Sequence, residues 1–243
     1  MFKKIALISL LLVSQSFSND DFEDEFNAKQ NNNEKENIIL ETYNRGMTTF
    51  NDKAFNYVLK PLSQGFEYIV PENARIGINN FFNNILFPIK LTNSLLQLKF
   101  DKSLIETERF LINSTFGLLG FMDPATKELN IIVESSEDFG QTLAYYGVPS
   151  GPHIVLPLLG PSNLRDSIGL IPDYYINPTN YINNREYNLY KNTNESYYFT
   201  AIEKINKTSF NYKLYENINK ESLDLYLFLK SAYNGNREKL INE

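Results

Sequence analysis

The residues of this chain that could carry acid–base chemistry lie in one stretch of the sequence. They are the adjacent acids Glu137-Asp138, the charged pair Arg165-Asp166 and the one histidine, His153. A Ser-His-Asp hydrolase would have to use His153 as its general base. Two carboxylates could act as general acid and base, but neighbouring side chains in a chain tend to point apart. We therefore favour a role for Glu137 and Asp138 at the start of a helix.

The composition excludes other kinds of chemistry. The 243 residues contain no cysteine, so disulfides, thiolate metal sites, a cysteine nucleophile and an acylated cysteine are all excluded. A single histidine cannot supply a site that needs two imidazoles. Phosphate-binding loops and the GxGxxG, HExxH and GxSxG patterns do not occur. His153 stands between Pro152 and an apolar run, which favours packing, and a periplasmic hydrolase that uses His153 stays an alternative.

The N-terminus has the pattern of a secretory signal. Lys3 and Lys4 precede a short apolar run, and small residues follow at Ser16 and Ser18, so we expect cleavage after Ser18. The apolar run is too short for a membrane span. Residues 19–37 are acidic and rich in asparagine, and we expect a disordered leader there. We expect residues 38–243 to form a single helical domain.

Periodic apolar residues predict a mainly α-helical fold for that domain. The predicted helices cover residues 43–57, 71–88, 91–98, 101–119, 162–169 and 221–233. Pro61 interrupts or ends the first of them. Asp101 or Ser103 is the expected cap of the helix at 101–119, and Ser162 is the expected cap of the helix at 162–169. Residues 128–134 could form a short strand or a covered extended segment, and residues 178–211 show weak helical periodicity. The last predicted helix is apolar nearly all round, which is typical of a helix that is buried or faces a partner or lipid.

The segment Glu137–Gly169 fits neither a helix nor a strand. Its glycines and prolines indicate a specific irregular path, because proline fixes φ and glycine reaches conformations that other residues avoid. The apolar run Ile154–Leu159 is interrupted only by Pro157 and would be unfavourable in water. A long apolar loop of this kind suggests a wall or lip that faces something apolar.

The net charge of −6 argues against nucleic acid as a partner. Much of that charge lies in residues 19–37, so the rest of the chain is close to neutral and carries no basic stripe. Amphipathic helices with asparagine-rich polar faces could form an ordinary core. They are also typical of a protein that lies in one membrane leaflet without spanning it.

Several motifs, in the right order, resemble those of the MlaA family, also called VacJ. They are Tyr43-Asn44-Arg45-Gly46-Met47, Tyr57-Val58-Leu59-Lys60-Pro61, Val70-Pro71, Arg109-Phe110-Leu111-Ile112-Asn113-Ser114-Thr115 and, above all, residues 137–166. The family pattern DFGxTLxxYGVxxGPYxxLPLxGPSxxRD is followed closely in that last segment, with His153 in place of the tyrosine. The likeness extends from about Tyr43 to Arg237.

The resemblance implies a fold and a function. It implies a ring-like helical protein with amphipathic helices and long irregular Gly/Pro loops, seated in the periplasmic leaflet of the outer membrane. Such a protein would pass mislocalised outer-leaflet phospholipids through an amphipathic channel, beside a porin trimer, to an MlaC-like periplasmic carrier. It would need no cofactor and would not be an enzyme. A structural or adhesive cell-surface protein, associated with a porin but without transport activity, is the alternative.

The resemblance and the polarity of the side chains together suggest three groups of residues. The candidates for the lipid path are polar: Asn51, Asp52, Asn113, Asp138, Gln141, Arg165 and Asp166. The candidates for membrane-facing positions are apolar: Ile78, Phe81, Phe82, Ile85, Leu111, Leu118 and Leu119. The candidates for a hinge are glycines: Gly117 and Gly120.

Overall fold

The computed structural model describes residues 38–133, 135–180 and 194–243, and in these ranges the chain is mainly helical. The elements are α3 (Ile38–Ala54), η1 (Phe55–Leu59), α4 (Lys60–Ile69), α5 (Glu72–Ile85), α6 (Phe87–Leu96), α7 (Phe100–Thr115), α8 (Pro124–Lys127), α9 (Phe139–Tyr145), β1 (His153–Leu156), β2 (Gly160–Asn163), α10 (Leu164–Ile176), η2 (Pro178–Asn180), α11 (Asn194–Glu221) and α12 (Leu225–Asn242). The expected signal peptide and acidic leader lie outside the described residues.

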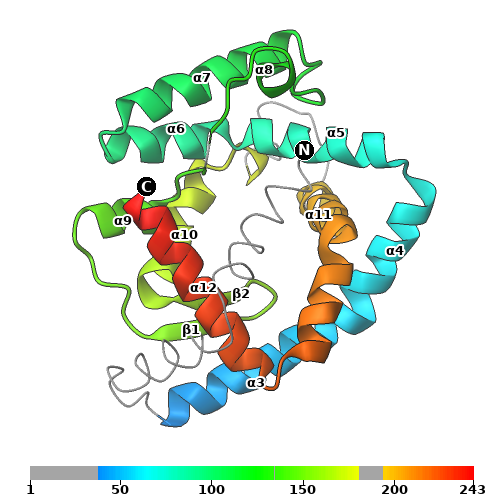
Figure 1. The fold of residues 1–243 in the computed structure, drawn as a ribbon, viewed down its shortest axis with the longest axis vertical. Helices are drawn as coiled ribbons and strands as arrows, with labels where there is room; N and C mark the ends of the chain where they lie inside the picture. Colours follow the sequence, from blue (N-terminus) through cyan, green and yellow to red (C-terminus); the bar gives the residue numbers. More distant parts are fainter. Residues whose placement is uncertain (1–37, 134, 181–193) are drawn as a thin grey trace.

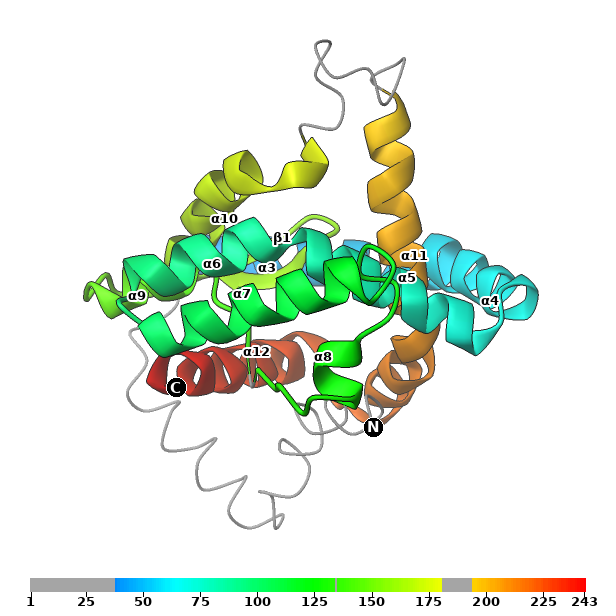
Figure 2. The same cartoon turned by 90° about the horizontal axis from the view of Figure 1, so that it is seen from above.

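The helices are arranged as a ring (Figure 1). Helices α3, α4, α5 and α6 follow one another around the perimeter, and α9 and α10 complete it on the side opposite α4. Helix α11 packs along α4 and α5. The second view shows α12 on one face of this ring, while the N-terminal end of α11 rises from the other face (Figure 2). The fold is therefore a flat ring of helices, as the resemblance implied, with α12 crossing one face.

Pro61 interrupts the first helix without ending it. Helix α3 continues through one π-helical turn, η1, directly into α4, where Pro61 occupies the first turn. Proline lacks an N–H, and its ring crowds the carbonyl four residues before it. The π turn just before Pro61 changes the backbone hydrogen-bond pattern there, so the proline is accommodated and the chain stays helical along this side of the ring.

The prediction of an irregular path through residues 137–169 was wrong. This segment contains α9, a β-hairpin and the start of α10, and the hairpin pairs His153 with Asn163 in antiparallel register. The cap of α10 is Asn163 and not Ser162, because the Asn163 side chain accepts the N–H of Asp166, and the helix begins at Leu164. It also runs past Gly169 to Ile176, with Pro172 inside it.

Other predicted boundaries also differ from the structure. Helix α7 ends at Thr115 rather than residue 119, and its start has no side-chain cap. Residues 128–133 form no strand within the described part of the chain, and they are not covered, because Leu129 and Ile132 are exposed. The last predicted helix, 221–233, begins too early: α11 ends at Glu221, and α12 starts at Leu225 with Asp224 as its cap. Helix α12 is mostly half-buried, because it lies across a face of the ring and not inside a core.

Burial in the described part of the chain reverses the usual pattern of a water-soluble protein. The buried apolar side chains are Phe82, Ala125, Val155, Tyr212 and Tyr226, and buried polar and charged side chains outnumber them severalfold. Large apolar side chains are instead exposed on almost every element of the ring. An exposed apolar surface of this extent is typical of a face that contacts lipid or another protein.

None of the helices in the described ranges combines the length and the hydropathy that a membrane-spanning helix needs.

The turn after α7 requires its glycines. A Cβ at Gly117 would lie 2.4 Å from the carbonyl oxygen of Asn113, and Gly120 has a φ of +93° with the Asn84 side chain 2.5 Å from where its Cβ would be. Leu118 and Leu119, between them, also have positive φ, at 51° and 59°. The turn is thus tightly packed, and its role as a hinge stays a prediction.

We expect Gly120→Ala to lower the free energy of unfolding by about 1–3 kcal/mol, because alanine at this φ is strained and its Cβ overlaps Asn84. Gly235→Ala is the matched control, since a Cβ there meets nothing within 4 Å in the middle of α12. It should stabilise the protein by about 0.5–1 kcal/mol. Thermal unfolding of both variants in detergent measures the difference, and equal melting temperatures would contradict the description of this turn.

Candidate functional site

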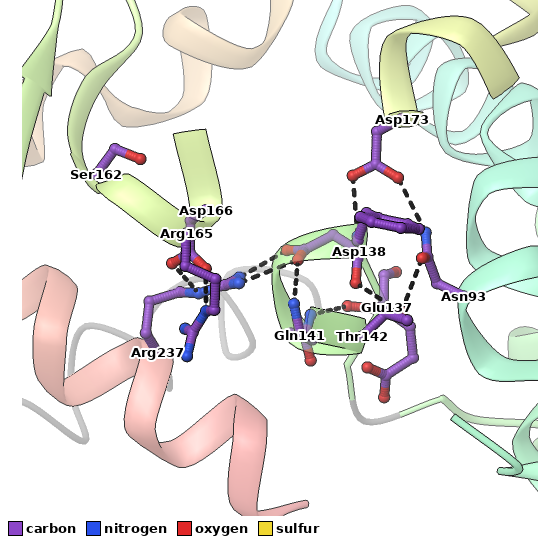
Figure 3. A network of polar contacts seen from close by, with 12 residues as sticks. Asn93, Glu137, Asp138, Gln141, Thr142, Ser162, Arg165, Asp166, Asp173 and Arg237 are labelled. Atoms are coloured by element: carbon purple, nitrogen blue, oxygen red, sulfur yellow. Dashed lines mark hydrogen bonds and ion pairs between the residues drawn. The ribbon is translucent and has the colours of Figure 1, made fainter. Parts of the chain in front are cut away.

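Polar side chains from α6, α9, α10 and α12 meet at the start of α9 (Figure 3). Asp138 caps that helix by accepting the N–H of Gln141 at 2.9 Å. Two glycines allow α9 and α10 to cross closely, because a Cβ at Gly169 would lie 2.6 Å from the backbone nitrogen of Gly140. The motif that begins at Glu137 therefore forms the joint between two sides of the ring.

Arg237 of α12 connects the two acids of this joint. Its terminal nitrogens donate to the Asp138 carboxylate at 2.6 and 3.0 Å, and its Nε lies 2.9 Å from the Asp166 carboxylate. Arg165 and the hydroxyl of Tyr233 also donate to Asp166. A single guanidinium thus holds α9, α10 and α12 together.

The charges of this joint are stabilised. Burial acts to raise the pKa of Asp166, but the hydrogen bonds from Tyr233 and Arg165 and the charge of Arg237 outweigh it and hold that pKa below its usual range. Burial opposes the charge of Arg237, yet the Asp138 and Asp166 carboxylates raise its pKa. Asp166 and Arg237 therefore stay ionised at neutral pH and form an ion pair.

The opposite side of α9 is joined to α6. The Thr142 hydroxyl donates to Asn93 at 2.8 Å, and Asn93 donates to the Asp173 carboxylate at 2.9 Å. The second oxygen of Asp173 accepts the N–H of Phe139 at 3.0 Å. Burial raises the pKa of Asp173.

Glu137 is paired with two lysines at the edge of this joint. Its side chain is fully buried, and Lys99 and Lys102 donate to it at 2.9 and 2.6 Å. Burial acts to raise its pKa, but the two lysines and Gln97 lower it overall. Glu137 and Asp138 therefore point to different partners, as expected for adjacent side chains.

Asparagines of α3 hold the hairpin. Asn44 donates to the carbonyl of His153 at 2.9 Å and accepts the N–H of Val155 at 2.8 Å. Seven residues on, Asn51 repeats the pattern with the carbonyl of Leu156 and the N–H of Leu158. The two amides satisfy backbone groups of the hairpin that would otherwise lack partners.

Asp52 lies on a different side of α3 and connects it to α11. Its carboxylate accepts hydrogen bonds from Asn219 at 2.6 Å, Tyr215 at 3.2 Å and Asn56 at 2.9 Å. Burial and the nearby Asp52 charge raise the pKa of Tyr215, so the phenol stays protonated as a donor.

The structure separates the candidate path residues into three places. Asp138, Gln141, Arg165 and Asp166 lie in the joint at α9, whereas Asn51 and Asp52 lie on α3. Asn113 of α7 is distant from both and lines a polar cavity between α5, α6 and α7. All of them make hydrogen bonds inside the protein. Their part in a lipid path stays a prediction.

A mainly apolar cavity of about 240 Å³ lies between α3, η1, the hairpin, α11 and α12. Phe55, Leu158, Leu159 and Leu229 supply its apolar lining, and Asn51, Thr48 and Lys230 add polar atoms. This cavity combines an apolar wall with a few polar groups, which is the usual character of a site for an amphipathic ligand.

The candidate membrane-facing residues differ in exposure. Leu111, Leu118 and Leu119 are 56%, 65% and 69% exposed, while Ile78, Phe81 and Ile85 are half-buried. The prediction was wrong for Phe82, which is 3% exposed because it packs edge-on against Phe199 of α11.

His153 also lines the apolar cavity. Its side chain is 7% exposed and lies between the rings of Tyr226 and Tyr233, with ring centroids 6.0 Å away in each case. This environment is consistent with the packing role that the sequence favoured.

Some residues of the joint could not be found from the sequence. Arg237 belongs to a charged helix end, Asn93 to a short amphipathic helix and Asp173 to a stretch without any motif. Each acts through partners more than thirty residues away. No local signal distinguishes them from ordinary surface residues.

A family model described as MlaA lipoprotein matches residues 39–240 of this chain. The chain belongs to the MlaA family. An uncharacterised protein of Rickettsia typhi is 32% identical over 97% of this chain and 93% of its own length. The intermembrane phospholipid transport system lipoproteins MlaA of Haemophilus influenzae and Escherichia coli are each 35% identical, over 56% and 55% of this chain and 55% and 54% of their own lengths.

A solved structure has the same fold as this MlaA-family chain. It comes from work on the structural basis for maintenance of bacterial outer membrane lipid asymmetry, and it aligns with a TM-score of 0.72 at 27% identity. The alignment covers 86% of this chain and 100% of that one. The ring-like helical fold and the family that the sequence motifs indicated are thereby confirmed.

We expect Arg237→Met to destabilise the protein by about 3 kcal/mol, because it leaves the buried Asp166 and the cap residue Asp138 without their shared cation. Lys239→Met, two residues on, removes an ion pair with Glu243 in which the lysine is 55% exposed, and it should cost almost nothing. Chemical denaturation of the two variants checks this. Equal midpoints would show that the ion network does not hold α12 in place.

Proposed function

We propose that this protein is the outer-membrane component of a phospholipid transport system that maintains lipid asymmetry. It takes up phospholipids that have strayed into the outer leaflet and passes them to a soluble periplasmic carrier similar to MlaC. The relatives in Haemophilus influenzae and Escherichia coli, which carry the name of such a system, support this assignment.

The observation that carries the proposal is the reversed polarity of the ring. A protein that exposes large apolar side chains on almost every element and buries hydrogen-bonded polar side chains suits a position in one bilayer leaflet. Irregular or polar structure at membrane depth is stable where it is enclosed by protein or water. The exposed leucines of the α7 end, Leu111, Leu118 and Leu119, would then contact acyl chains or a porin trimer.

The apolar cavity supports a lipid as the cargo. Its leucine and phenylalanine wall would contact acyl chains, and the polar atoms of Asn51, Thr48 and Lys230 would lie near the head group. Movement of lipid through the ring needs no covalent chemistry in this account, so we assign no catalytic residue, metal or cofactor. His153 serves to pack the hairpin against α12.

Deletion of the gene in its source bacterium should increase the phospholipid that an external phospholipase can digest, because strayed lipid stays in the outer leaflet. The wild-type gene should restore the low level. Leu159→Glu should fail to restore it, since a carboxylate in the apolar cavity disfavours acyl chains.

Asn234→Glu is the matched control, because Asn234 is an exposed polar residue of α12 and does not line the cavity. It should restore the low level as well as the wild type does. Unchanged surface phospholipid in the deletion strain would overturn the transport proposal and favour a structural or adhesive protein of the cell surface. Full activity of Leu159→Glu would remove the cavity from the transport path.

A further inference from the structure

A second cavity, of about 190 Å³, lies between α5, α6, α7 and the chain that follows α7. Its volume is several times the ~30 Å³ that one water molecule occupies in the liquid. Its lining is mainly polar, with Asn80, Asn83 and Asn84 from α5, and one side is formed by the stacked rings of Phe87 and Phe110, 4.2 Å apart. A polar floor beside an aromatic wall suits the head group of an amphipathic molecule.

Lys90 places a cation in this cavity. Its side chain is 16% exposed, and the nearest carboxylate oxygen in the described part of the chain, on Glu106, lies 3.9 Å away. That distance is too long for a hydrogen bond. A mostly buried lysine whose nearest carboxylate oxygen is 3.9 Å away gains little from that pair, so an anionic group brought closer would stabilise it.

The other charged groups near Lys90 have closer partners of their own. Burial is the main cause that lowers the pKa of Lys90; the charge of Glu106 opposes it, and the charges of Arg109 and Lys207 add to the lowering. Asp123 is occupied elsewhere, because it accepts hydrogen bonds from Arg109, Asn113 and the N–H of Thr126. Lys207 is paired with Glu203 at 2.6 Å, so of these cations Lys90 has the longest ion pair, at 3.9 Å from Glu106.

Glu106 gives the cavity a second, opposite charge. Its side chain is 5% exposed and lines the same cavity as Lys90. A ligand with a phosphate and an ammonium group could bring its phosphate to Lys90 and its ammonium to Glu106. Both protein charges would then gain close partners that each lacks in the loose pair.

We propose that this cavity binds the phosphate of a zwitterionic lipid head group, with Lys90 donating to the phosphate and Glu106 accepting from the amine. The asparagine amides of α5 add neutral hydrogen bonds, and the Phe87–Phe110 stack contacts the lipid backbone. The site is separate from the apolar cavity between α3, the hairpin and α12. It goes beyond the proposed transport function because it assigns a binding site for the head group, whereas transport needs only the passage of lipid.

The test uses the full chain in a detergent that contains no phosphate, with calorimetry to measure binding of three probes. Glycerophosphoethanolamine should bind at least tenfold more tightly than glycerophosphoglycerol, which lacks the amine, and than inorganic phosphate. Equal binding of inorganic phosphate and glycerophosphoethanolamine would overturn the head-group assignment. No binding of any probe would overturn the site.

Variants then locate the binding. Lys90→Met/Glu106→Gln removes both charges together, so it should reduce affinity for glycerophosphoethanolamine at least tenfold while the melting temperature stays the same or rises. Glu106→Gln alone should keep phosphate binding and lose the preference for the amine. Lys213→Met, at a lysine that is 71% exposed on α11, is the matched control and should bind as the wild type does.

Wild-type affinity in Lys90→Met/Glu106→Gln would show that the phosphate binds elsewhere. The melting temperature separates loss of the site from loss of the fold. A double variant that is folded but unable to bind supports the proposal. This result is separate from the transport proposal, because it holds even if deletion of the gene leaves lipid asymmetry unchanged.

Discussion

Buried polar groups must find hydrogen-bond partners, and this constraint shapes the whole molecule. The interior of the ring is rich in asparagine, serine, arginine and acidic side chains, so hydrophobic burial alone cannot hold it together. The connections are made instead by amides and ion networks. Asn44 and Asn51 hold the hairpin to α3, Asn93 joins α6 to α10, and Arg237 joins α12 to α9 and α10.

Because polar side chains fill much of the interior, many large apolar side chains are exposed and have a different role. Leucines, isoleucines and aromatics on the outside of the ring gain little in water, but contact with acyl chains or a partner would stabilise the seated protein. Full burial of one Leu- or Phe-sized side chain contributes about 1.5–3 kcal/mol. Because many such residues are exposed in the described part of the chain, contact with lipid or a partner would add substantially to stability.

Local sequence patterns predicted the helical class and the positions of most helices, because apolar periodicity reports which face of a helix is buried or covered. They failed where partners distant in the sequence decide the structure. Pro61 was read as an interruption, but the π turn that accommodates it could not be foreseen. Residues 137–169 were predicted to be irregular because of their glycines and prolines, but Gly147, Gly151 and Gly160 with positive φ lie at the turns and strand ends that connect α9, β1 and β2.

The candidate site also contains some residues that local motifs predicted and others that they could not predict. Asp138, Gln141, Arg165 and Asp166 do lie together, because the motif encodes the joint at α9, whereas Asn51, Asp52 and Asn113 lie on other elements. Their partner Arg237 and the cavity residues Lys90 and Glu106 come from segments without a recognisable motif. Phe82 was placed outside because helical periodicity cannot tell which apolar face α11 covers.

The central claim is that the outside of the ring contacts hydrocarbon while the protein does not cross the bilayer. The chain contains no tryptophan, so a single introduced tryptophan reports its own surroundings. In vesicles with brominated acyl chains, fluorescence of Leu111→Trp and Leu118→Trp should be strongly quenched, and that of Lys213→Trp should not. Equal, weak quenching at all three positions would contradict the account, because the apolar perimeter would then lie in water.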